Sequence, residues 1–396
     1  MVRESLEPDA AYADVAVHGD GLVALQYRRR RGGNTEEVRS PLRSGSRVRL
    51  ERTGDLFSLY LVGAAGQLEP VGSVLVNLPP EPLAGLFVCA HHPDGIETAV
   101  FTDVRLENRV PGADEQRRIE STLEIIEIET GRREIVYRAA EHFEAPNWSP
   151  DGGYFVFNQG GRIYRLDAGG NRAEMIETGP ADRCNNDHGF SPDGRWLAIS
   201  HSPEGQSLIY VVPAEGGEPR LVTPLGPSYW HGWSPDGRQL AYCAERNGEY
   251  DVYVIPAEGG EEIRLTHAPG LDDGPDYTPD GRYIYFNSER TGRMSIWRMA
   301  LDGSGQERMT FDDDYADWFP HPSPDGRWVA FLSYAGHVQG HPPNEEVVLR
   351  LMPLEGGDPR VLARLFGGQG TINVPSWSPA GDRFAFVSYR LVLAGW

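Results

Sequence analysis

The sequence predicts an all-β protein whose larger part is a six-bladed β-propeller, preceded by a separate, partial β-sandwich. The first observation is a turn sequence, Ser/Thr-Pro-Asp-Gly or Ser-Pro-Ala-Gly, that occurs six times at intervals of 42, 43, 44, 45 and 55 residues. The second is the strand-like alternation of apolar and polar residues that flanks these turns. The third is a composition with 47 Gly, 31 Pro and 10% aromatic residues, typical of many short strands joined by tight turns.

The first 107 residues lack the repeated turn but alternate as strands do. The expected strands are Tyr12–Val17, Leu22–Tyr27, Ser46–Arg52, Leu56–Val62, Gly72–Val76 and Thr98–Leu106. Residues 108–120 are polar and contain Pro and Gly, so we expect a linker there. The propeller then occupies residues 121–396. Two domains agree with a length of 396 residues, which exceeds what one hydrophobic core supports.

The repeated turns begin at Ser149, Ser191, Ser234, Thr278, Ser323 and Ser378. In each one the hydroxyl bonds the local backbone, Pro presets φ, and Gly ends the turn without steric cost. Each turn therefore joins two antiparallel strands. Two further strands follow, as in Asp251–Ile255 and Arg264–Thr266, which gives the four strands of a propeller blade.

The sixth repeat has two strands, near Val374–Tyr389, where the others have four. A predicted hairpin, residues 121–129 and 133–138, has the pattern of a third and a fourth blade strand. We therefore expect this hairpin to pair with the C-terminal blade. Closure of that kind leaves no open sheet edge in the ring.

The repeats "SPDGRWLAIS", "SPDGRQLAYCAERNGEYDVYVIPAEGGEEIRLT" and "TPDGRYIYFNSERTGRMSIWRMALDGSGQERMT" resemble those of TolB-like propellers, also known as WD40-like or PD40 repeats. The resemblance covers residues 121–396. It implies the propeller fold and says less about activity, because this scaffold hosts binding proteins, peptidase lids and carbohydrate lyases.

A second resemblance concerns the stretch from "RVRLERTGDLFSLYLV" to "GLFVCAHHPDGIETAVFTDVRLE", which is similar to the C-terminal half of concanavalin-like or LamG-like jelly-roll domains. Only half of such a sandwich is present, and a partial sandwich leaves apolar edges uncovered. Either further strands precede Met1 or another chain covers the edges. The second alternative implies self-association.

The composition excludes several classes of protein. A net charge of −21 repels phosphate backbones, and the short basic run Arg28–Arg31 is better explained as the solvated end of a hairpin, so we expect no nucleic-acid partner. Cys89, Cys184 and Cys243 form no C-x-x-C pair, so we expect neither a structural zinc site nor a redox motif.

The sequence contains no apolar stretch of about 18 residues, so no membrane span is expected. Its first residues, Met1-Val2-Arg3, continue into polar sequence rather than into a signal peptide. The sequence as written therefore predicts a cytoplasmic protein, and a start further upstream would predict a periplasmic one.

Polar residues precede the repeated turns, where the innermost strand of each blade is expected. In a propeller these strands line the central channel, so their side chains converge from all six blades. We therefore predict a ligand site for a glycan or a peptide at the channel mouth. Its candidate contacts are Asn147, Asp187, Trp230, Asp273, Asp317, Trp318 and Asn373.

Three histidines, His188, His231 and His321, stand two or three residues before the turn in three blades. At similar heights around one axis, and together with Gln369, they are the candidate ligands of a divalent metal ion. His231, His188 and Asp276 are also the candidates for proton transfer. The alternative is that these side chains bond the backbone of the neighbouring blade.

Trp230 and Trp318 are candidates for stacking on a sugar ring, with blade packing as the alternative. Arg246 and Arg290 lie in loops between the second and third strands and are candidates for gripping a carboxylate. Ion pairs with Glu245 and Glu289 are the alternative for these two arginines. The fifth repeat carries an extra loop with His337 and His341, and long loops on propellers are commonly functional.

Two functional hypotheses follow. The first is a non-catalytic recognition protein that binds a peptide or a glycan at the channel mouth. The second is a metal-dependent carbohydrate-active enzyme, a lyase or hydrolase, in which Arg290 binds a uronate and His231 is the base. Oligogalacturonate lyases have similar repeats and bind a metal with His and Gln, but the His-x-His pair expected after Gln369 is absent here, where Asn373 and Ser376 stand.

Overall fold

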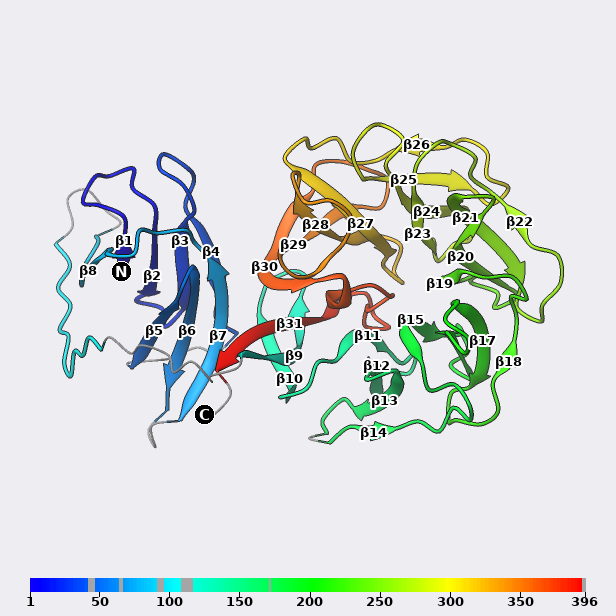
Figure 1. Ribbon diagram of the computed structural model, residues 1–396, viewed down its shortest axis with the longest axis horizontal. Coiled ribbons are helices and arrows are strands. Elements are labelled where there is room, and N and C mark those ends of the chain that lie inside the picture. The colour runs from blue at the N-terminus through cyan, green and yellow to red at the C-terminus, as the bar shows by residue number, and fades with distance from the viewer. Residues whose placement is uncertain (42–46, 64–66, 91–95, 108–116, 171, 394–396) are drawn as a thin grey trace. The chain divides into compact units, whose positions relative to one another are not determined.

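The computed structural model describes residues 1–41, 47–63, 67–90, 96–107, 117–170 and 172–393. Apart from one short 3-10 helix, η1 (Gln369–Thr371), every regular element among these residues is a β-strand, which confirms the predicted all-β fold. The chain divides into two compact units (Figure 1). The first comprises Met1–Ile119 with the residues from Leu391 onward, and the second is Glu120–Arg390.

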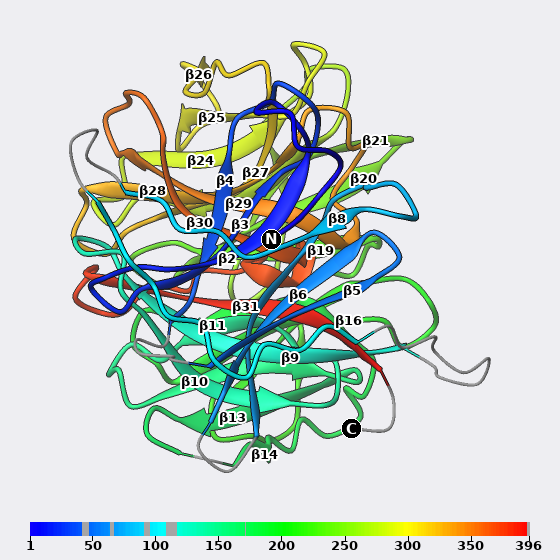
Figure 2. The same ribbon diagram turned by 90° about the vertical axis from the view of Figure 1, so that its left-hand side faces the viewer.

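The first unit contains two antiparallel sheets (Figure 2). One has the strand order β4 (Glu36–Arg39), β3 (Val23–Arg28), β2 (Tyr12–Val17), β1 (Val2–Arg3), β8 (Leu83–Ala84), and the other is β5 (Val48–Thr53), β6 (Leu56–Val62), β7 (Leu68–Leu75). Alternate residues of both sheets, among them Leu25 and Phe57, are fully buried in one cluster between them. Two sheets packed face to face are what the alternation predicts. The resemblance to a jelly roll stays a prediction.

The strand predicted at Thr98–Leu106 is wrong. Residues 96–107 form no ladder with any described residue, and their apolar side chains are exposed, with Ile96 at 96% and Val100 at 85%. Alternation can specify which face of a strand is apolar, but a strand also needs a partner edge for its backbone groups.

The second unit contains five four-stranded sheets, each with its strands in chain order. These blades are β11 (Glu144–Trp148), β12 (Tyr154–Gln159), β13 (Arg162–Asp167), β14 (Glu174–Met175); β15 (Cys184–Phe190), β16 (Trp196–His201), β17 (Leu208–Pro213), β18 (Arg220–Leu221); β19 (Ser228–Trp233), β20 (Gln239–Arg246), β21 (Glu249–Pro256), β22 (Ile263–Arg264); β23 (Asp272–Tyr277), β24 (Tyr283–Ser288), β25 (Ser295–Ala300), β26 (Glu307–Arg308); and β27 (Tyr315–Pro322), β28 (Trp328–Ala335), β29 (Pro343–Pro353), β30 (Arg360–Gly368).

The repeated turns use their side chains as the sequence predicts. In the second blade the Ser191 hydroxyl donates to Asp193 Oδ1 at 2.6 Å and accepts the Trp196 N–H at 3.0 Å. The sixth turn has Ala in place of this Asp, and there Ser378 donates instead to Asp382 Oδ1 at 2.8 Å. Each turn therefore fixes the angle between the first two strands of its blade.

The sixth blade is built from both ends of the propeller sequence. Strands β10 (Arg133–Ala139), β9 (Arg117–Glu127) and β31 (Arg383–Leu393) form one sheet in that order, and a bridge between Trp377 and Phe384 adds the innermost segment. The blades follow one another around a ring (Figure 1). β9 begins within the stretch predicted as a linker, at Arg117, and residues 108–116 of that linker lie outside the described residues.

A buried ion pair lies inside this closing sheet. The Arg133 guanidinium donates to both carboxylate oxygens of Glu124, at 3.0 and 2.6 Å, and the two side chains are 5% and 3% exposed. Ser388 of β31 donates to the same carboxylate at 2.6 Å. These contacts link the first strands of the unit to the last one.

No helix among the described residues is long and apolar enough to cross a membrane.

Candidate acidic channel site

The inner strands of the first five blades each contain a register shift shortly before the repeated turn, for instance between Asp273 and Asp276 in β23. Such bulges re-aim side chains and are frequent beside functional sites. In three blades the bulge places a residue with positive φ before a proline: Ala145 (57°), Gly274 (61°) and Phe319 (53°). A bulky residue such as Phe319 is strained in this conformation, so the surrounding packing must hold it there.

The three histidines do not occupy equivalent positions. His321 stands two residues before its turn, whereas His188 and His231 stand three residues before theirs, where the other four blades have Pro. Because successive residues of a strand point to opposite faces, a shift by one residue redirects the side chain. The expectation of similar heights around one axis overlooked this shift.

His231 pairs with a carboxylate of the next blade. Its Nε2 lies 3.0 Å from Asp273 Oδ1, and the His231 side chain is only 3% exposed. Burial alone would lower the pKa of His231, but the carboxylates of Asp273, Asp187 and Asp276 outweigh it and raise that pKa. Burial would likewise raise the pKa of Asp273, yet His231 lowers it to about 2. The raised pKa of His231 and the lowered pKa of Asp273 both favour the charged forms of this pair.

His321 forms a second histidine–carboxylate pair between neighbouring blades. Its Nδ1 lies 3.2 Å from Asp276 Oδ2, and its Nε2–H donates to the carbonyl of Ile372 at 2.7 Å. Burial raises the pKa of Asp276, an effect that His321 partly offsets. Both ring nitrogens of His321 thus have partners within the protein.

Asp187 connects blades that are not neighbours in the ring. It accepts a hydrogen bond from Asn373, which precedes the sixth blade, and another from Asn185 at 2.6 Å. Burial and the charge of Asp273 raise the pKa of Asp187. Asp187 belongs to the second blade and Asn373 leads into the sixth, and these two blades flank the first. The contact between them therefore passes along the channel side of the first blade. We call this group of side chains the channel cluster; it consists of Glu144, Asp187, His231, Asp273, Asp276, His321 and Asn373.

The predicted metal site is not assembled. His188 is fully buried, neither of its ring nitrogens forms a hydrogen bond of ordinary geometry with a described residue, and burial lowers its pKa to about 4. Gln369 lies half-buried in η1. Across the described ranges, no three His, Cys, Asp or Glu side chains are grouped so that they could hold a metal ion.

The tryptophans expected to stack on a sugar lie in hydrophobic cores. Trp230 is 1% exposed and packs against Gly189 of the preceding blade, and Trp318 is 2% exposed. Asn147 is also buried and bonds two neighbouring blades, donating to the Pro375 carbonyl and accepting the Phe190 N–H at 3.1 Å. These three residues hold blades together. For Trp230 and Trp318 this is the blade packing expected from the sequence as the alternative to stacking on a sugar.

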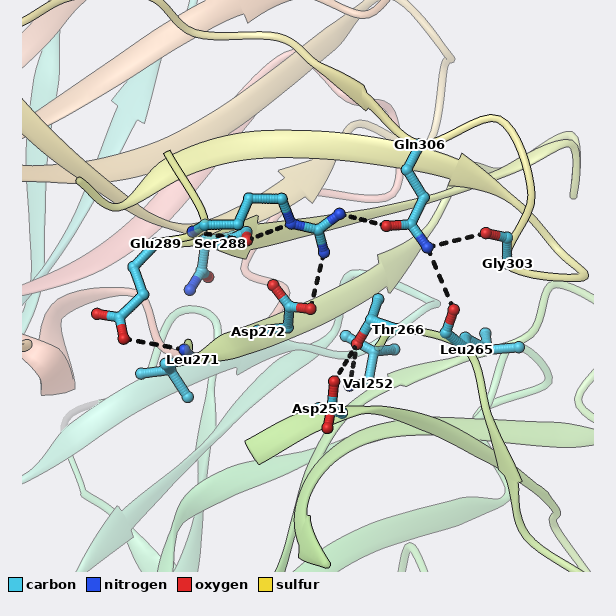
Figure 3. A network of polar contacts seen from close by, with 12 residues as sticks. Asp251, Val252, Leu265, Thr266, Leu271, Asp272, Ser288, Glu289, Gly303 and Gln306 are labelled. Atoms are coloured by element: carbon cyan, nitrogen blue, oxygen red, sulfur yellow. Dashed lines mark hydrogen bonds and ion pairs between the residues drawn. The ribbon is translucent and has the colours of Figure 1, made fainter. Parts of the chain in front are cut away.

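Both candidate arginines are held in ion pairs, although with partners other than those expected. Arg246 contacts both carboxylate oxygens of Glu262, at 2.7 and 2.8 Å. Arg290 pairs with Asp272 Oδ2 at 2.7 Å. The Arg290 guanidinium also donates to Ser288 and to Gln306, both labelled with Asp272 in Figure 3, while Glu289 accepts the Leu271 N–H instead.

Asp317 likewise has partners inside its own blade. It accepts the Ser333 hydroxyl at 2.6 Å and lies 3.4 Å from Arg350 Nη1. Burial raises the pKa of Asp317, and Arg350 opposes this shift. Arg246, Arg290 and Asp317 therefore stabilise blades, and none has a charge left unpaired for a ligand.

A family model described as the TolB beta propeller domain matches residues 230–341. The protein Atu1656 of Agrobacterium fabrum is 53% identical over 271 residues, which are 68% of this chain and 92% of that protein. A solved structure from Agrobacterium tumefaciens, provisionally assigned to TolB, is also 53% identical, with a TM-score of 0.68 over 69% of this chain and 99% of the other. The chain belongs to the TolB-like β-propeller family.

TolB from Acinetobacter baumannii has a TM-score of 0.50 at 17% identity, covering 81% of this chain and 78% of that one. At this identity the likeness shows the fold alone. The resemblance of the repeats to TolB-like propellers, and the propeller they predicted, are thus confirmed.

Sequence reasoning missed Glu144 in the channel cluster and Phe319 beside it, and it named His341 without placing it there. Glu144 stands five residues before its turn, the position that Asp273 and Asn373 occupy in their blades, so an alignment of the repeats on their turns would have found it. Phe319 stacks on His231 with ring centroids 6.1 Å apart, and His341 of the long loop meets Phe319 at 5.3 Å. No sequence signal indicates that this loop folds back onto the inner strand.

Glu144 gives the propeller a specific pH dependence. Burial and the charge of Asp187 raise its pKa from 4.5 to about 7. Because the folded protein holds this proton more tightly than the unfolded chain, the free energy of unfolding falls as pH rises from about 4.5 to about 7. The raised pKa of His231 adds a loss of stability at higher pH.

We expect Glu144→Gln to stabilise the propeller at pH 8 by roughly 1–3 kcal/mol, since Glu144 is only half-buried, and to have no such effect at pH 4. Urea unfolding at both pH values measures the difference. Glu204→Gln on an exposed loop is the control. An equal effect of Glu144→Gln at pH 4 and pH 8 would contradict the assigned pKa.

Proposed function

We propose that this TolB-like propeller is a non-catalytic recognition protein that binds a peptide segment carrying a basic residue at the channel cluster. The observation that carries the proposal is the surplus of acid in the cluster. Four carboxyl groups, those of Glu144, Asp187, Asp273 and Asp276, are gathered with two imidazoles. Burial and, to a smaller extent, the neighbouring carboxylates raise the pKa values of Asp187 and Glu144, and a cationic group placed among them would favour their charged forms.

A peptide is favoured over a glycan because the side chains suited to sugars are engaged elsewhere. Both candidate indoles are buried in blade cores, and both candidate arginines are paired with carboxylates. A protein ligand, in contrast, can offer Lys or Arg to buried carboxylates and amides to Asn373, whose Oδ1 has no hydrogen-bond partner among the described residues.

Metal-assisted carbohydrate chemistry is not proposed as a second function. It would need His188, His231 and His321 to point at one position, yet His321 has both nitrogens engaged and His188 is fully buried beside backbone groups of Ala145 and Val156 in the preceding blade. The paired carboxyl and imidazole groups of the channel cluster are better suited to binding a cationic ligand than to catalysis.

The test is an array of immobilised twelve-residue peptides that differ in one central residue, Lys, Arg, Gln or Glu. We expect the wild-type chain to retain the Lys and Arg peptides, and Asp187→Asn/Asp273→Asn to bind them about tenfold or more weakly. Glu204→Gln, which changes the net charge without touching the channel, is the control. Equal retention by the wild type and the channel variant, or a preference for Glu, would overturn the proposal.

A further inference from the structure

Residues Ile96–Glu107 have the sequence of a strand without its pairing, and we call them the exposed apolar segment. On one face apolar or β-branched residues recur at every second position: Ile96, Thr98, Val100, Thr102, Val104 and Leu106. Four of these side chains are strongly exposed, Ile96 at 96%, Val100 at 85%, Val104 at 58% and Leu106 at 85%. Monomeric proteins seldom leave so many neighbouring apolar groups in water.

The first unit offers an edge for such a strand. Its smaller sheet ends at β5, which packs over β2, while β7 packs over β3 and β4. On the β5 side the larger sheet continues through β1 to β8, where Leu83 is 45% exposed. A strand added beside β5 would therefore cover β1 and β8 and make the two sheets more nearly equal in width.

The charges on β5 and on the exposed apolar segment are complementary. β5 presents Arg49 and Glu51, which pair with each other at 2.5 Å and are 39% and 30% exposed. The segment presents Arg105 and Glu107, also two residues apart. In an antiparallel register that sets Arg105 opposite Glu51, Glu107 falls opposite Arg49. Leu106 then lies opposite Leu50, which packs against the sandwich core. This register places residues 103–107 opposite residues 49–53 of β5, and it forms both charged pairs together with the Leu106–Leu50 contact.

We propose that a second copy of this chain supplies the partner, each copy adding its exposed apolar segment to β5 of the other. Both halves of the contact are present in every chain, so a two-fold arrangement forms it twice. Each copy contributes five residues of its segment and five of its β5 edge, about half of the 20–30 residues per partner of a standard interface, so we expect a dimer of moderate affinity. The dimer carries two propellers, so it goes beyond the recognition proposed for a single channel.

The first test is sedimentation equilibrium of the full chain and of Leu106→Asp, which alters the residue opposite Leu50. The wild type is expected to be a dimer at micromolar concentration, and Leu106→Asp to raise the dissociation constant at least about tenfold. Since Leu106 is 85% exposed in the single chain, its replacement should leave the thermal unfolding of the dilute chain unchanged. A monomeric wild type at 100 µM, on the order of the weakest specific associations, would overturn the proposal.

The second test is a charge exchange that checks the register. Arg105→Glu places two carboxylates opposite each other, Glu51→Arg places two cations opposite each other, and the double variant restores both pairs. Each single variant should weaken the dimer and the double variant should recover it, while Glu204→Arg on the propeller changes nothing. Single variants that dimerise like the wild type, or a double variant weaker than both, would rule out this register and this edge.

Discussion

Replacing Arg133 by Ala is expected to lower the free energy of unfolding of the propeller by about 3–5 kcal/mol. The substitution leaves the Glu124 carboxylate, 3% exposed, without its two guanidinium hydrogen bonds. Among the described residues, the Ser388 hydroxyl, at 2.6 Å, would still donate to it. The substitution weakens the sheet β10-β9-β31, which joins the two ends of the ring. If this sixth blade opens, the sides of the neighbouring blades that pack against it become exposed to solvent as well.

Urea unfolding followed by Trp fluorescence measures this effect, because the tryptophans from Trp148 to Trp377 all lie in the second unit. Arg195→Ala is the matched control. Arg195 also pairs with a carboxylate, Asp193 at 3.1 Å, but the two side chains are 79% and 47% exposed, and such pairs contribute less than about 1 kcal/mol. A loss below 1 kcal/mol for Arg133→Ala would show that the ring does not depend on the buried pair.

Replacing Gly189 by Val is expected to destabilise the propeller by about 3 kcal/mol, the upper part of the range for overpacked cores. A Cβ at this position would collide with the indole of Trp230 in the next blade. The indole has no room to move, since Trp230 is 1% exposed within a hydrophobic cluster. The Gly189 carbonyl also accepts the Trp233 indole N–H at 3.1 Å, so the backbone is held from the same side.

The control for this variant is Gly169→Val, at an exposed turn where an added Cβ would have no heavy atom within 4 Å. Its unfolding midpoint should stay close to that of the wild type. If Gly189→Val matched Gly169→Val, the two inner strands would not be packed as closely as described.

The propeller could be predicted from the sequence because its determinants are local. The hydrogen bonds of Ser191 to Asp193 and to the Trp196 N–H all form within a stretch of six residues, and the same short pattern recurs in each blade. The strand expected at Thr98–Leu106 failed for the opposite reason. Its alternation is local, but whether it pairs depends on an edge elsewhere, and the described residues give it none.

The site was only partly predictable. The sequence named Asp187, His231, Asp273 and Asn373 from their positions before the turns, and the structure brings these four side chains together; that they bind a ligand stays a prediction. Position alone could not show the bulges, nor that His188 is fully buried while His321 pairs with Asp276. Nor could it assign the partners of Arg290, since Asp272 lies eighteen residues away in sequence and beside it in space.

The most direct measurement is a crystal structure of the chain with the Lys-containing peptide that the array retains best. Recognition at the channel cluster predicts the Lys ammonium within hydrogen-bond distance of Asp187 or Asp273, with the ring of six blades unchanged. A peptide lying along the outer strands β14, β18, β22 or β26, with the channel cluster left as it is, would contradict it.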